Sequence, residues 1–249
     1  MSIVSNNPEC LAKIEWRDGL PYSATYQDVY FSSDNGLQET EYVFLQGNKL
    51  LPRWQQLQQN KFTIIETGFG TGLNFLSAVK LWLESTQSNA TLHYISVEKY
   101  PLSSSDITTA LAYWPQLRNY RESLLSQYDQ LIDSSAPLMM FNNRVQLNLL
   151  IGDATVSLGK INECADAWFL DGFSPSKNPD MWSPELLGQV AKLSKQNTTF
   201  ATFTSAGLVK RSLVAAGFTV VKRSGFGKKR EMLIGHYAAV DLLKTFDGA

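Results

Sequence analysis

A chain of 249 residues, 44% of them hydrophobic, is long enough for one large domain or for one domain with a small extension. A net charge of -1 argues against a general polyanion binder, and two widely separated cysteines argue against a disulfide framework or a metal site. Neither a signal peptide nor an apolar stretch near the ~20 residues of a membrane span is present, so we expect a cytoplasmic protein without membrane contact.

Residues 1–60 are expected to form a β-rich extension that packs on a main domain of residues 61–249. Apolar residues cluster at 26–31 and again at 42–45, and an Asn-Gly pair lies in the segment 33–36 between them. An Asn-Gly pair between apolar runs is typical of a β-hairpin. A short helix is expected to follow near residues 49–59.

From residue 61 onward, strand and helix patterns alternate, which is typical of a mostly parallel sheet with helices on its faces. Strands are expected at 62–66, 92–98, 145–151, 165–170 and 198–203, and helices at 73–84, 103–134 (interrupted near Trp114), 184–194 and 207–216. The segments 218–223 and 231–235 flank a glycine- and lysine-rich loop and predict a closing antiparallel hairpin. The order favours a Rossmann-like α/β fold with a seven-stranded, mostly parallel sheet and an antiparallel last strand.

The first of these strands runs into a turn in which Gly68, Gly70 and Gly72 occupy every second position before Leu73. Glycines at a strand-to-helix turn bring backbone N–H groups close to a ligand. The dinucleotide fingerprint needs its third glycine at position 73, so the pyrophosphate-binding pattern fails by one residue. A nicotinamide oxidoreductase is therefore disfavoured.

Acids end three successive predicted strands, at Glu66, Glu98 and Asp153. A carboxylate before the glycines repels a pyrophosphate but attracts a ligand that carries an ammonium and a sulfonium, such as S-adenosylmethionine. We expect Glu98 to accept hydrogen bonds from ribose hydroxyls, Asp153 to lie near adenine and Asn74 to hold the methionine end, although Asp153 or Asn74 alone is better explained as a cap or turn residue. The predicted cofactor-binding residues are Glu66, Gly68, Phe69, Gly70, Thr71, Gly72, Asn74, Glu98, Lys99, Asp153, Ala154 and Asp171.

The predicted strand at 165–170 continues into an unusual loop that runs from Asp171 to Trp182. Together with the segments 66–76 and 201–235, this loop resembles the methyltransferase domains of the MnmC family of tRNA wobble-uridine modification enzymes. The resemblance covers nearly the whole chain, including Tyr30-Phe31-Ser32 and residues 42–45. It implies a class I S-adenosylmethionine-dependent methyltransferase. The implied reaction methylates the exocyclic amine of 5-aminomethyl(-2-thio)uridine at the tRNA wobble position, giving the 5-methylaminomethyl form.

Asp171 and Phe173 are the predicted catalytic residues of such an enzyme. We expect Asp171 to accept a hydrogen bond from the acceptor amine and to aim its lone pair. Phe173, Met181 and Trp182 are predicted to stack on the everted base, which offsets lost stacking by ~1–3 kcal/mol per base. Lys177 is predicted to touch a phosphate or the base edge. Trp182 fits a core position equally well.

Basic residues concentrate near the carboxyl end of the chain. Residues 210–230 hold seven of the 22 basic side chains and no acid, so the rest of the chain carries 15 basic and 23 acidic residues. A focused basic patch on an acidic body predicts contact with an anionic partner, here the tRNA anticodon arm. Lys228, Lys229 and Arg230 are the expected phosphate contacts, and a solvated hairpin is the alternative.

Many members of the family continue into a flavin-dependent oxidase domain. The chain stops at Ala249 without a second glycine fingerprint, so we expect no FAD, a monomer, and either a stand-alone or a truncated enzyme. Two alternatives remain: a methyltransferase for a small-molecule or protein amine, and a non-catalytic RNA-binding module that keeps the cofactor fold. The basic hairpin argues against the first, and the intact set of strand-end acids argues against the second.

Overall fold

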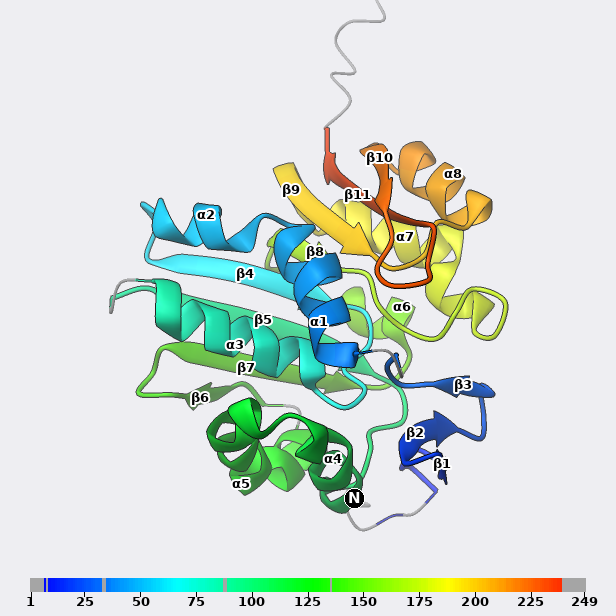
Figure 1. Cartoon of the computed structure of the whole chain (residues 1–249). Helices are drawn as coiled ribbons and strands as arrows, with labels where there is room; N and C mark the ends of the chain where they lie inside the picture. The colour runs from blue at the N-terminus through cyan, green and yellow to red at the C-terminus, as the bar shows by residue number, and fades with distance from the viewer. Residues whose placement is uncertain (1–6, 8, 33–34, 87–88, 135, 239–249) are drawn as a thin grey trace, which may run out of the picture.

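The computed structural model describes residues 7, 9–32, 35–86, 89–134 and 136–238. An eight-stranded sheet runs through the middle of the molecule in the order β10-β11-β9-β8-β4-β5-β7-β6 (Figure 1). Its strands are β4 (Lys61–Glu66), β5 (Thr91–Glu98), β6 (Leu138–Met140), β7 (Val145–Ile151), β8 (Ala165–Phe169), β9 (Ser194–Thr202), β10 (Phe218–Ser224) and β11 (Glu231–Tyr237). The five strands from β9 to β7 are mutually parallel, whereas β11 and β6 run antiparallel to their neighbours.

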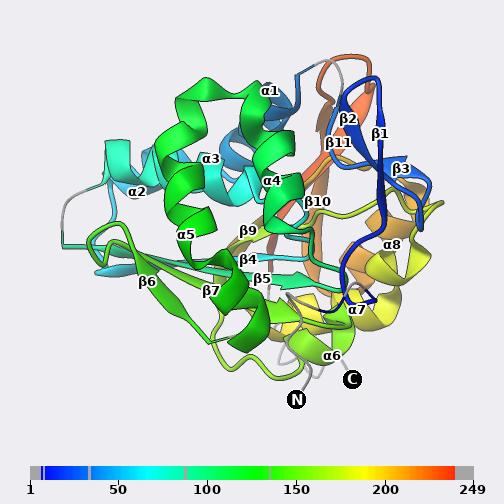
Figure 2. The same ribbon diagram turned by 90° about the horizontal axis from the view of Figure 1, so that it is seen from below.

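Helices cover both faces of this sheet, as Figures 1 and 2 show. One face carries α1 (Gly36–Thr40), α2 (Leu50–Gln55), α3 (Leu73–Ser85), α4 (Ser104–Ala110) and α5 (Arg118–Ser134). The other face carries α6 (Ala154–Leu158), α7 (Pro184–Lys192) and α8 (Gly207–Ala215). Each face has its own cluster of buried apolar side chains, which is the arrangement that a parallel sheet requires.

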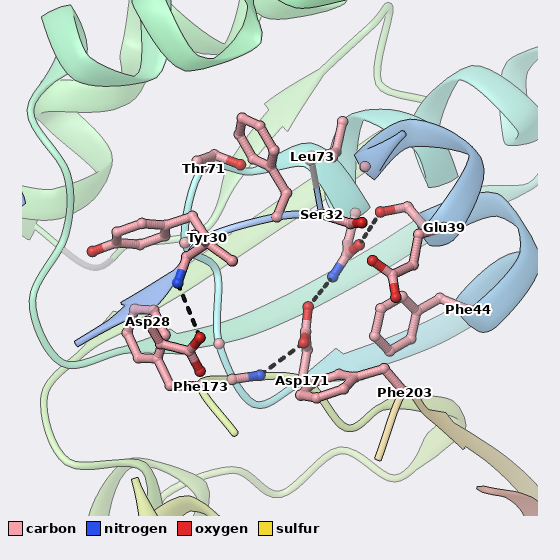
Figure 3. A pocket seen from close by; sticks show the side chains of 18 of the residues that line it. Asp28, Tyr30, Ser32, Glu39, Phe44, Thr71, Leu73, Asp171, Phe173 and Phe203 are labelled. Carbon is pink, nitrogen blue, oxygen red and sulfur yellow. Dashed lines mark hydrogen bonds between the residues drawn. The ribbon is translucent and has the colours of Figure 1, made fainter. Parts of the chain in front are cut away.

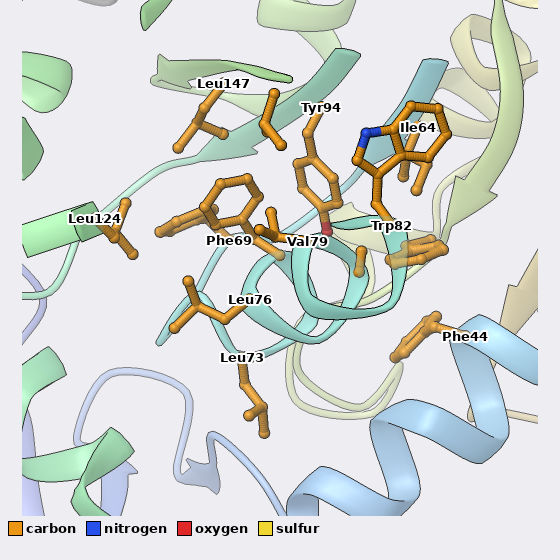
Figure 4. Close-up of a cluster of buried hydrophobic side chains, with 14 of the residues drawn as sticks. Phe44, Ile64, Phe69, Leu73, Leu76, Val79, Trp82, Tyr94, Leu124 and Leu147 are labelled. Atoms are coloured by element: carbon orange, nitrogen blue, oxygen red, sulfur yellow. The ribbon is translucent and has the colours of Figure 1, made fainter. Parts of the chain in front are cut away.

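Helix α3 is the central element of the first cluster (Figure 4). Leu76, Val79 and Trp82 are fully buried on it, and the Trp82 ring packs edge-on to Trp54 of α2 with 5.1 Å between centroids. A helix that is apolar on most of its circumference is buried on most sides. Here the sheet lies on one side, and α1, α2 and α5 lie on others, so the glycine turn before α3 is rigidly placed.

The predicted α/β order is confirmed from residue 61 onward, including the closing hairpin and its antiparallel last strand. The predicted strand number is wrong by one, because the short strand β6 pairs with β7. Strand β6 has only three residues, which is too short for an alternation of apolar and polar side chains to predict it from sequence. The proposed division into an extension and a main domain at residue 60 stays a prediction.

The expected hairpin at 26–45 is wrong. Strands β1 (Ile14–Arg17), β2 (Leu20–Ser23) and β3 (Asp28–Val29) form a separate antiparallel sheet, and residues 41–46 form a π-helix that continues α1. The side chain of Asn35 caps α1 by accepting the Gln38 N–H, while positions 33 and 34 of the expected turn lie outside the described residues. Leu37, Val43 and Phe44 are buried at helical spacing against the first core cluster, which overrides the strand propensity of the apolar run.

Gly235 offers a test of how tightly β11 packs against its neighbouring strands. A methyl group there would lie 2.5 Å from a ring carbon of the fully buried Phe200 and would also clash with the Thr219 carbonyl oxygen. Gly235→Ala is expected to lower the free energy of unfolding by ~1–3 kcal/mol in urea titrations. Gly188→Ala is the matched control, because its methyl group meets nothing within 4 Å in α7, and it is expected to stabilise by roughly 0.5–1 kcal/mol. Equal effects of the two changes would contradict this account of the packing.

Candidate functional site

A cavity of about 380 Å³ opens at the carboxyl ends of β4, β5 and β8 (Figure 3). The glycine turn and the loop after β8 form its floor, and residues of the segments 28–32 and 36–44 form one wall. Phe203 and Lys229 reach it from the carboxyl-terminal part of the chain. In parallel α/β sheets the ligand binds at this edge, where strand ends and helix starts meet.

A smaller cavity of about 70 Å³ adjoins the first. The two share Gly68, Glu98, Gly172 and Phe173 as lining residues. The smaller cavity adds residues from the ends of β5 and β7, among them Asp153 and Ala154. The two cavities are therefore neighbouring parts of one site that follows the strand ends across the sheet.

The glycine turn adopts the backbone conformation that its sequence requires. Gly70 and Gly72 have φ angles of 51° and 76°, which side-chain-bearing residues rarely adopt, and Gly72 is the N-cap of α3. Glu98 is oriented by this turn, since its carboxylate accepts the Gly70 N–H at 3.0 Å and the Tyr100 N–H at 2.9 Å. Burial raises the pKa of Glu98 above its ordinary value.

Asn74, in the first turn of α3, connects two carboxyl groups below the larger cavity. The Thr40 hydroxyl donates to Asn74 Oδ1 at 2.8 Å, which fixes the orientation of the amide. The amide nitrogen then donates to Asp171 Oδ2 at 2.7 Å and to Glu66 Oε1 at 3.0 Å. The second Glu66 oxygen accepts the Ser96 hydroxyl at 2.7 Å.

The two carboxyl groups joined by Asn74 differ in environment and therefore in pKa. Glu66 is 0% exposed, and burial raises its pKa to about 8. Asp171 lines the larger cavity, and burial raises its pKa to about 6 even though the Gly172 N–H donates to Oδ1 at 2.8 Å. The carboxyl of Glu66 therefore holds its proton to higher pH than the carboxyl of Asp171 does.

Phe173 is held by aromatic side chains of the amino-terminal segment. The Tyr26 ring stacks on it at 4.8 Å between centroids, and the Tyr30 ring meets it edge-on at 5.1 Å. Asp28 completes the contact by accepting the Ser174 N–H at 3.0 Å. The sequence analysis did not predict Tyr26, Tyr30 or Asp28 as site residues, although the density of aromatic residues at 26–31 was a signal that could have identified this part of the site.

Lys229 closes the outer wall of the larger cavity. Its ammonium lies 2.6 Å from Glu39 Oε1 of α1 and 4.5 Å from the centroid of the Phe203 ring. This placement differs from the predicted phosphate contact, because the Lys229 charge is compensated by a carboxylate at the rim. Glu39 was not among the predicted site residues.

Most of the predicted cofactor residues line one cavity or the other: Gly68, Phe69, Gly70, Thr71, Asn74, Glu98, Lys99, Asp153, Ala154 and Asp171. Glu66 and Gly72 line neither. Glu66 lies beneath Asn74 and is hydrogen-bonded to its amide, so it adjoins the cavity without lining it, and its contact with the cofactor stays a prediction. Asp153 also caps α6 by accepting the Thr155 and Val156 N–H groups, which is the capping role that the sequence analysis gave as its alternative.

The predicted substrate residues are only partly brought together. Phe173, Met181 and Lys229 line the cavities, whereas Lys177, Lys228 and Arg230 are exposed outside them. The predicted base stacking of Trp182 is contradicted, because its side chain is 2% exposed and packs edge-on to Phe203. The Trp182 indole N–H donates to the Phe173 carbonyl oxygen at 2.9 Å and so supports the loop from within.

The charge of the larger cavity identifies the kind of ligand that fits it. Asp28, Glu39, Glu98 and Asp171 contribute carboxyl groups to the lining, and Lys229 contributes an ammonium. Such a wall repels a pyrophosphate and suits a ligand with an ammonium and a sulfonium. The residues present therefore fit S-adenosyl-L-methionine.

Comparison with known proteins agrees with this assignment. A family model described as S-adenosyl-L-methionine-dependent methyltransferase matches residues 115–238. The tRNA 5-methylaminomethyl-2-thiouridine biosynthesis bifunctional protein MnmC of Methylobacillus flagellatus is 53% identical over 230 residues, covering 92% of this chain and 36% of that protein. The protein of the same name from Legionella pneumophila (strain Lens) is 45% identical over 246 residues, covering 92% and 37%.

The chain thus spans about a third of the length of the curated relatives it matches. Among solved structures, the crystal structure of MNMC2 from Aquifex aeolicus superposes with a TM-score of 0.73 at 25% identity and covers 92% of this chain and 72% of that one. Within the part of the chain that the structure describes, no helix is long and apolar enough to cross a membrane.

Proposed function

We propose that the chain is an S-adenosyl-L-methionine-dependent methyltransferase of the family that includes the methyltransferase portion of MnmC, and that it methylates the exocyclic amine of 5-aminomethyl(-2-thio)uridine at the wobble position of tRNA. The product is the 5-methylaminomethyl form. The observation that carries the proposal is the Asp171 carboxylate, oriented by two hydrogen bonds on the floor of a cavity that adjoins a second one beside Glu98.

Residues of both cavities are proposed to hold the cofactor. Glu98 accepts hydrogen bonds from the ribose hydroxyls, and Asp153 and Ala154 contact the adenine end in the smaller cavity. Asn74 and the glycine turn hold the methionine end. When bound, S-adenosyl-L-methionine supplies an electrophilic methyl group.

Asp171 is proposed to prepare the acceptor amine. The amine attacks only when it is neutral, because an ammonium has no lone pair. Burial raises the pKa of Asp171 to about 6, so the carboxylate is ionised above that pH. It accepts an N–H hydrogen bond from the amine, and then it accepts the proton that the nitrogen loses. Apolar walls formed by Phe44, Leu73 and Phe203 favour the neutral amine and hold it in place, in opposition to the ionised Asp171, which favours the ammonium.

Phe173 is proposed to stack on the everted uracil, since its ring is fixed by Tyr26 and Tyr30 and lines both cavities. Met181 contacts the base or the cofactor from the smaller cavity. Lys228 and Arg230 of the exposed hairpin loop hold the anticodon-arm backbone, and Lys177 contacts a nearby phosphate. The tRNA anticodon arm is the partner that we propose for these contacts.

A flavin-dependent oxidase domain is a further proposed partner, because the matched relatives are bifunctional and about three times as long as the aligned region. We propose a cytoplasmic site of action, where the tRNA substrate is found, and a monomeric methyltransferase unit.

The proposal predicts that the purified chain transfers a tritiated methyl group to tRNA that carries 5-aminomethyluridine and not to tRNA that lacks it. Nucleoside mass spectrometry should find the 5-methylaminomethyl form in the first tRNA only, and cells without the protein should accumulate the aminomethyl form. The alternative acceptors are small amines and lysine-containing peptides. Methylation of either with a kcat/KM equal to that for the modified tRNA would replace the proposed substrate, and cofactor binding without any transfer would indicate the RNA-binding module.

A further inference from the structure

A cation–aromatic cluster outside the cavities joins the π-helix to the closing hairpin. The guanidinium carbon of Arg223 lies 4.2 Å from the centroid of the Tyr42 ring. The Tyr42 hydroxyl donates to the Ser224 carbonyl oxygen at 2.9 Å, and the Phe226 ring lies 6.0 Å away, tilted by 45°. Tyr42, Arg223 and Phe226 are each half-buried, so part of every side chain meets solvent.

The cluster lies on the same two segments that contribute Glu39 and Lys229 to the larger cavity. Glu39 precedes Tyr42 by three residues in the continuous helical segment, and Lys229 follows Phe226 by three residues in the hairpin loop. Both of these charged residues line the cavity and pair with each other at 2.6 Å. The Lys229 N–H also donates to the Phe226 carbonyl oxygen at 3.0 Å. The segments that carry the cluster therefore also form the cavity wall.

Arg223 differs from Lys222 and Lys229, each of which pairs with a carboxylate among the described residues. Lys222 pairs with Glu231 at 2.6 Å, and Lys229 pairs with Glu39. Across the described residues, no carboxylate forms an ion pair with Arg223. Adjacent side chains of a strand point to opposite faces, so Lys222 and Arg223 of β10 face different surroundings. The Arg223 guanidinium is oriented by an aromatic ring while its charge stays available.

We propose that Tyr42, Arg223 and Phe226 form a stacking platform for the nucleobase next to the modified uridine in the RNA substrate, an inference that rests on the proposed function. A planar guanidinium on a tyrosine ring offers a flat cationic face, which is the surface that unpaired RNA bases stack on. When one base leaves the anticodon loop for the cavity, its neighbour loses a stacking partner. The platform lies on the segments that form the cavity wall, where that neighbour emerges, and replaces the lost contact.

Binding to an anticodon stem-loop tests the platform. The probe carries 5-aminomethyluridine at the wobble position and, in two further versions, an abasic site on one or the other side of it. The wild-type chain is expected to lose about tenfold in affinity for one abasic version, because base–aromatic stacking is worth ~1–3 kcal/mol. Tyr42→Leu and Arg223→Lys should bind the complete probe about tenfold more weakly than wild type and should be insensitive to that abasic site.

Two controls separate stacking from charge and folding. Lys222→Arg, on the same strand but facing away and with its charge kept, should keep both the affinity and the sensitivity to the abasic site, and Arg223→Lys should keep the salt dependence of wild type. An abasic effect that is as large in Tyr42→Leu as in wild type, or absent from wild type, overturns the platform. Methyl transfer to the complete probe is measured in parallel, and its absence in wild type would count against the proposed function instead.

Discussion

Replacing Asp171 with asparagine is expected to lower the rate of methyl transfer by about 10²–10⁴-fold at saturating cofactor and tRNA. The carboxylate is the only group of the Asn74-linked pair that lines the cavity, and Glu66 beneath it is held neutral by burial. Asparagine keeps the size of the side chain but neither accepts the proton nor favours the productive hydrogen bond from the amine. Single-turnover measurements at saturating cofactor separate this loss from any change in cofactor affinity.

The pH profile gives the same prediction a second readout. Burial raises the pKa of Asp171 to about 6, so kcat/KM of the wild-type enzyme should rise through pH 6 as the carboxylate ionises. In Asp171→Asn that limb should disappear, and only the deprotonation of the substrate amine at higher pH should remain. A normal rate in the variant, with the limb near pH 6 intact, would show that another group accepts the proton.

Asp28→Asn is the matched control for charge. Asp28 contributes a carboxylate to the same cavity, but its Oδ2 accepts the Ser174 N–H and it has no hydrogen bond to Asn74. Asp28→Asn should therefore lower the rate of methyl transfer far less than Asp171→Asn does. Equal losses in the two variants would mean that the net charge of the cavity, and not the position of one carboxylate, supports the reaction.

The position of Asp171 could be predicted from sequence because it depends only on the order of strands, turns and helices along a short stretch of the chain. A strand followed by Asp-Gly, in an alternating strand–helix chain, places an acid at the sheet edge beside the glycine turn. Glu98 and Asp153 followed from the same rule, and both line the smaller cavity. The rule does not distinguish a side chain that reaches the cavity from one that points below it, and Glu66 is the example: its contacts are with Asn74 and Ser96.

The other half of the site depends on contacts between segments far apart in the chain. Phe173 is held by Tyr26 and Tyr30, and Lys229 is paired with Glu39 across 190 residues. Nothing in local periodicity relates these positions. Residues 42–45 were misassigned for the same reason, because an apolar run of four is compatible with a strand until the packing surface of α3 and β9 selects a helix. Tertiary packing determines both the partners of Phe173 and Lys229 and the helical conformation of residues 42–45.

Glu66→Gln is expected to flatten the dependence of stability on pH above neutrality. Burial raises the pKa of Glu66 from 4.5 to about 8, so between these values the folded chain binds a proton that the unfolded chain has released. Stability therefore falls as pH rises through this window and levels off above pH 8. Asp171 is already largely ionised between pH 6.5 and 8.5. Over this range the free energy of unfolding of wild type should fall by on the order of 2 kcal/mol more than that of Glu66→Gln.

Urea unfolding at the two pH values measures this difference. Glutamine keeps the shape of the side chain without a titrating group: its oxygen accepts the Asn74 N–H, and the Ser96 hydroxyl, which donates to Glu66 in the wild type, turns to accept from the glutamine amide. Glu231→Gln is the control, because Lys222 lowers the pKa of that exposed carboxylate and it is ionised throughout the window. Parallel pH curves for wild type and Glu66→Gln would show that Glu66 is ionised at neutral pH after all.

The same variant also tests how the two carboxyl groups divide the charge. If Glu66 is neutral while Asp171 titrates, then replacing it with a neutral amide leaves the charge near Asp171 unchanged at pH 6, and the limb of kcat/KM near that value should stay in place. A limb that moves to lower pH in Glu66→Gln would mean that Glu66 already carries negative charge there. The acid beneath Asn74 would then be the group that raises the pKa of Asp171, in place of burial.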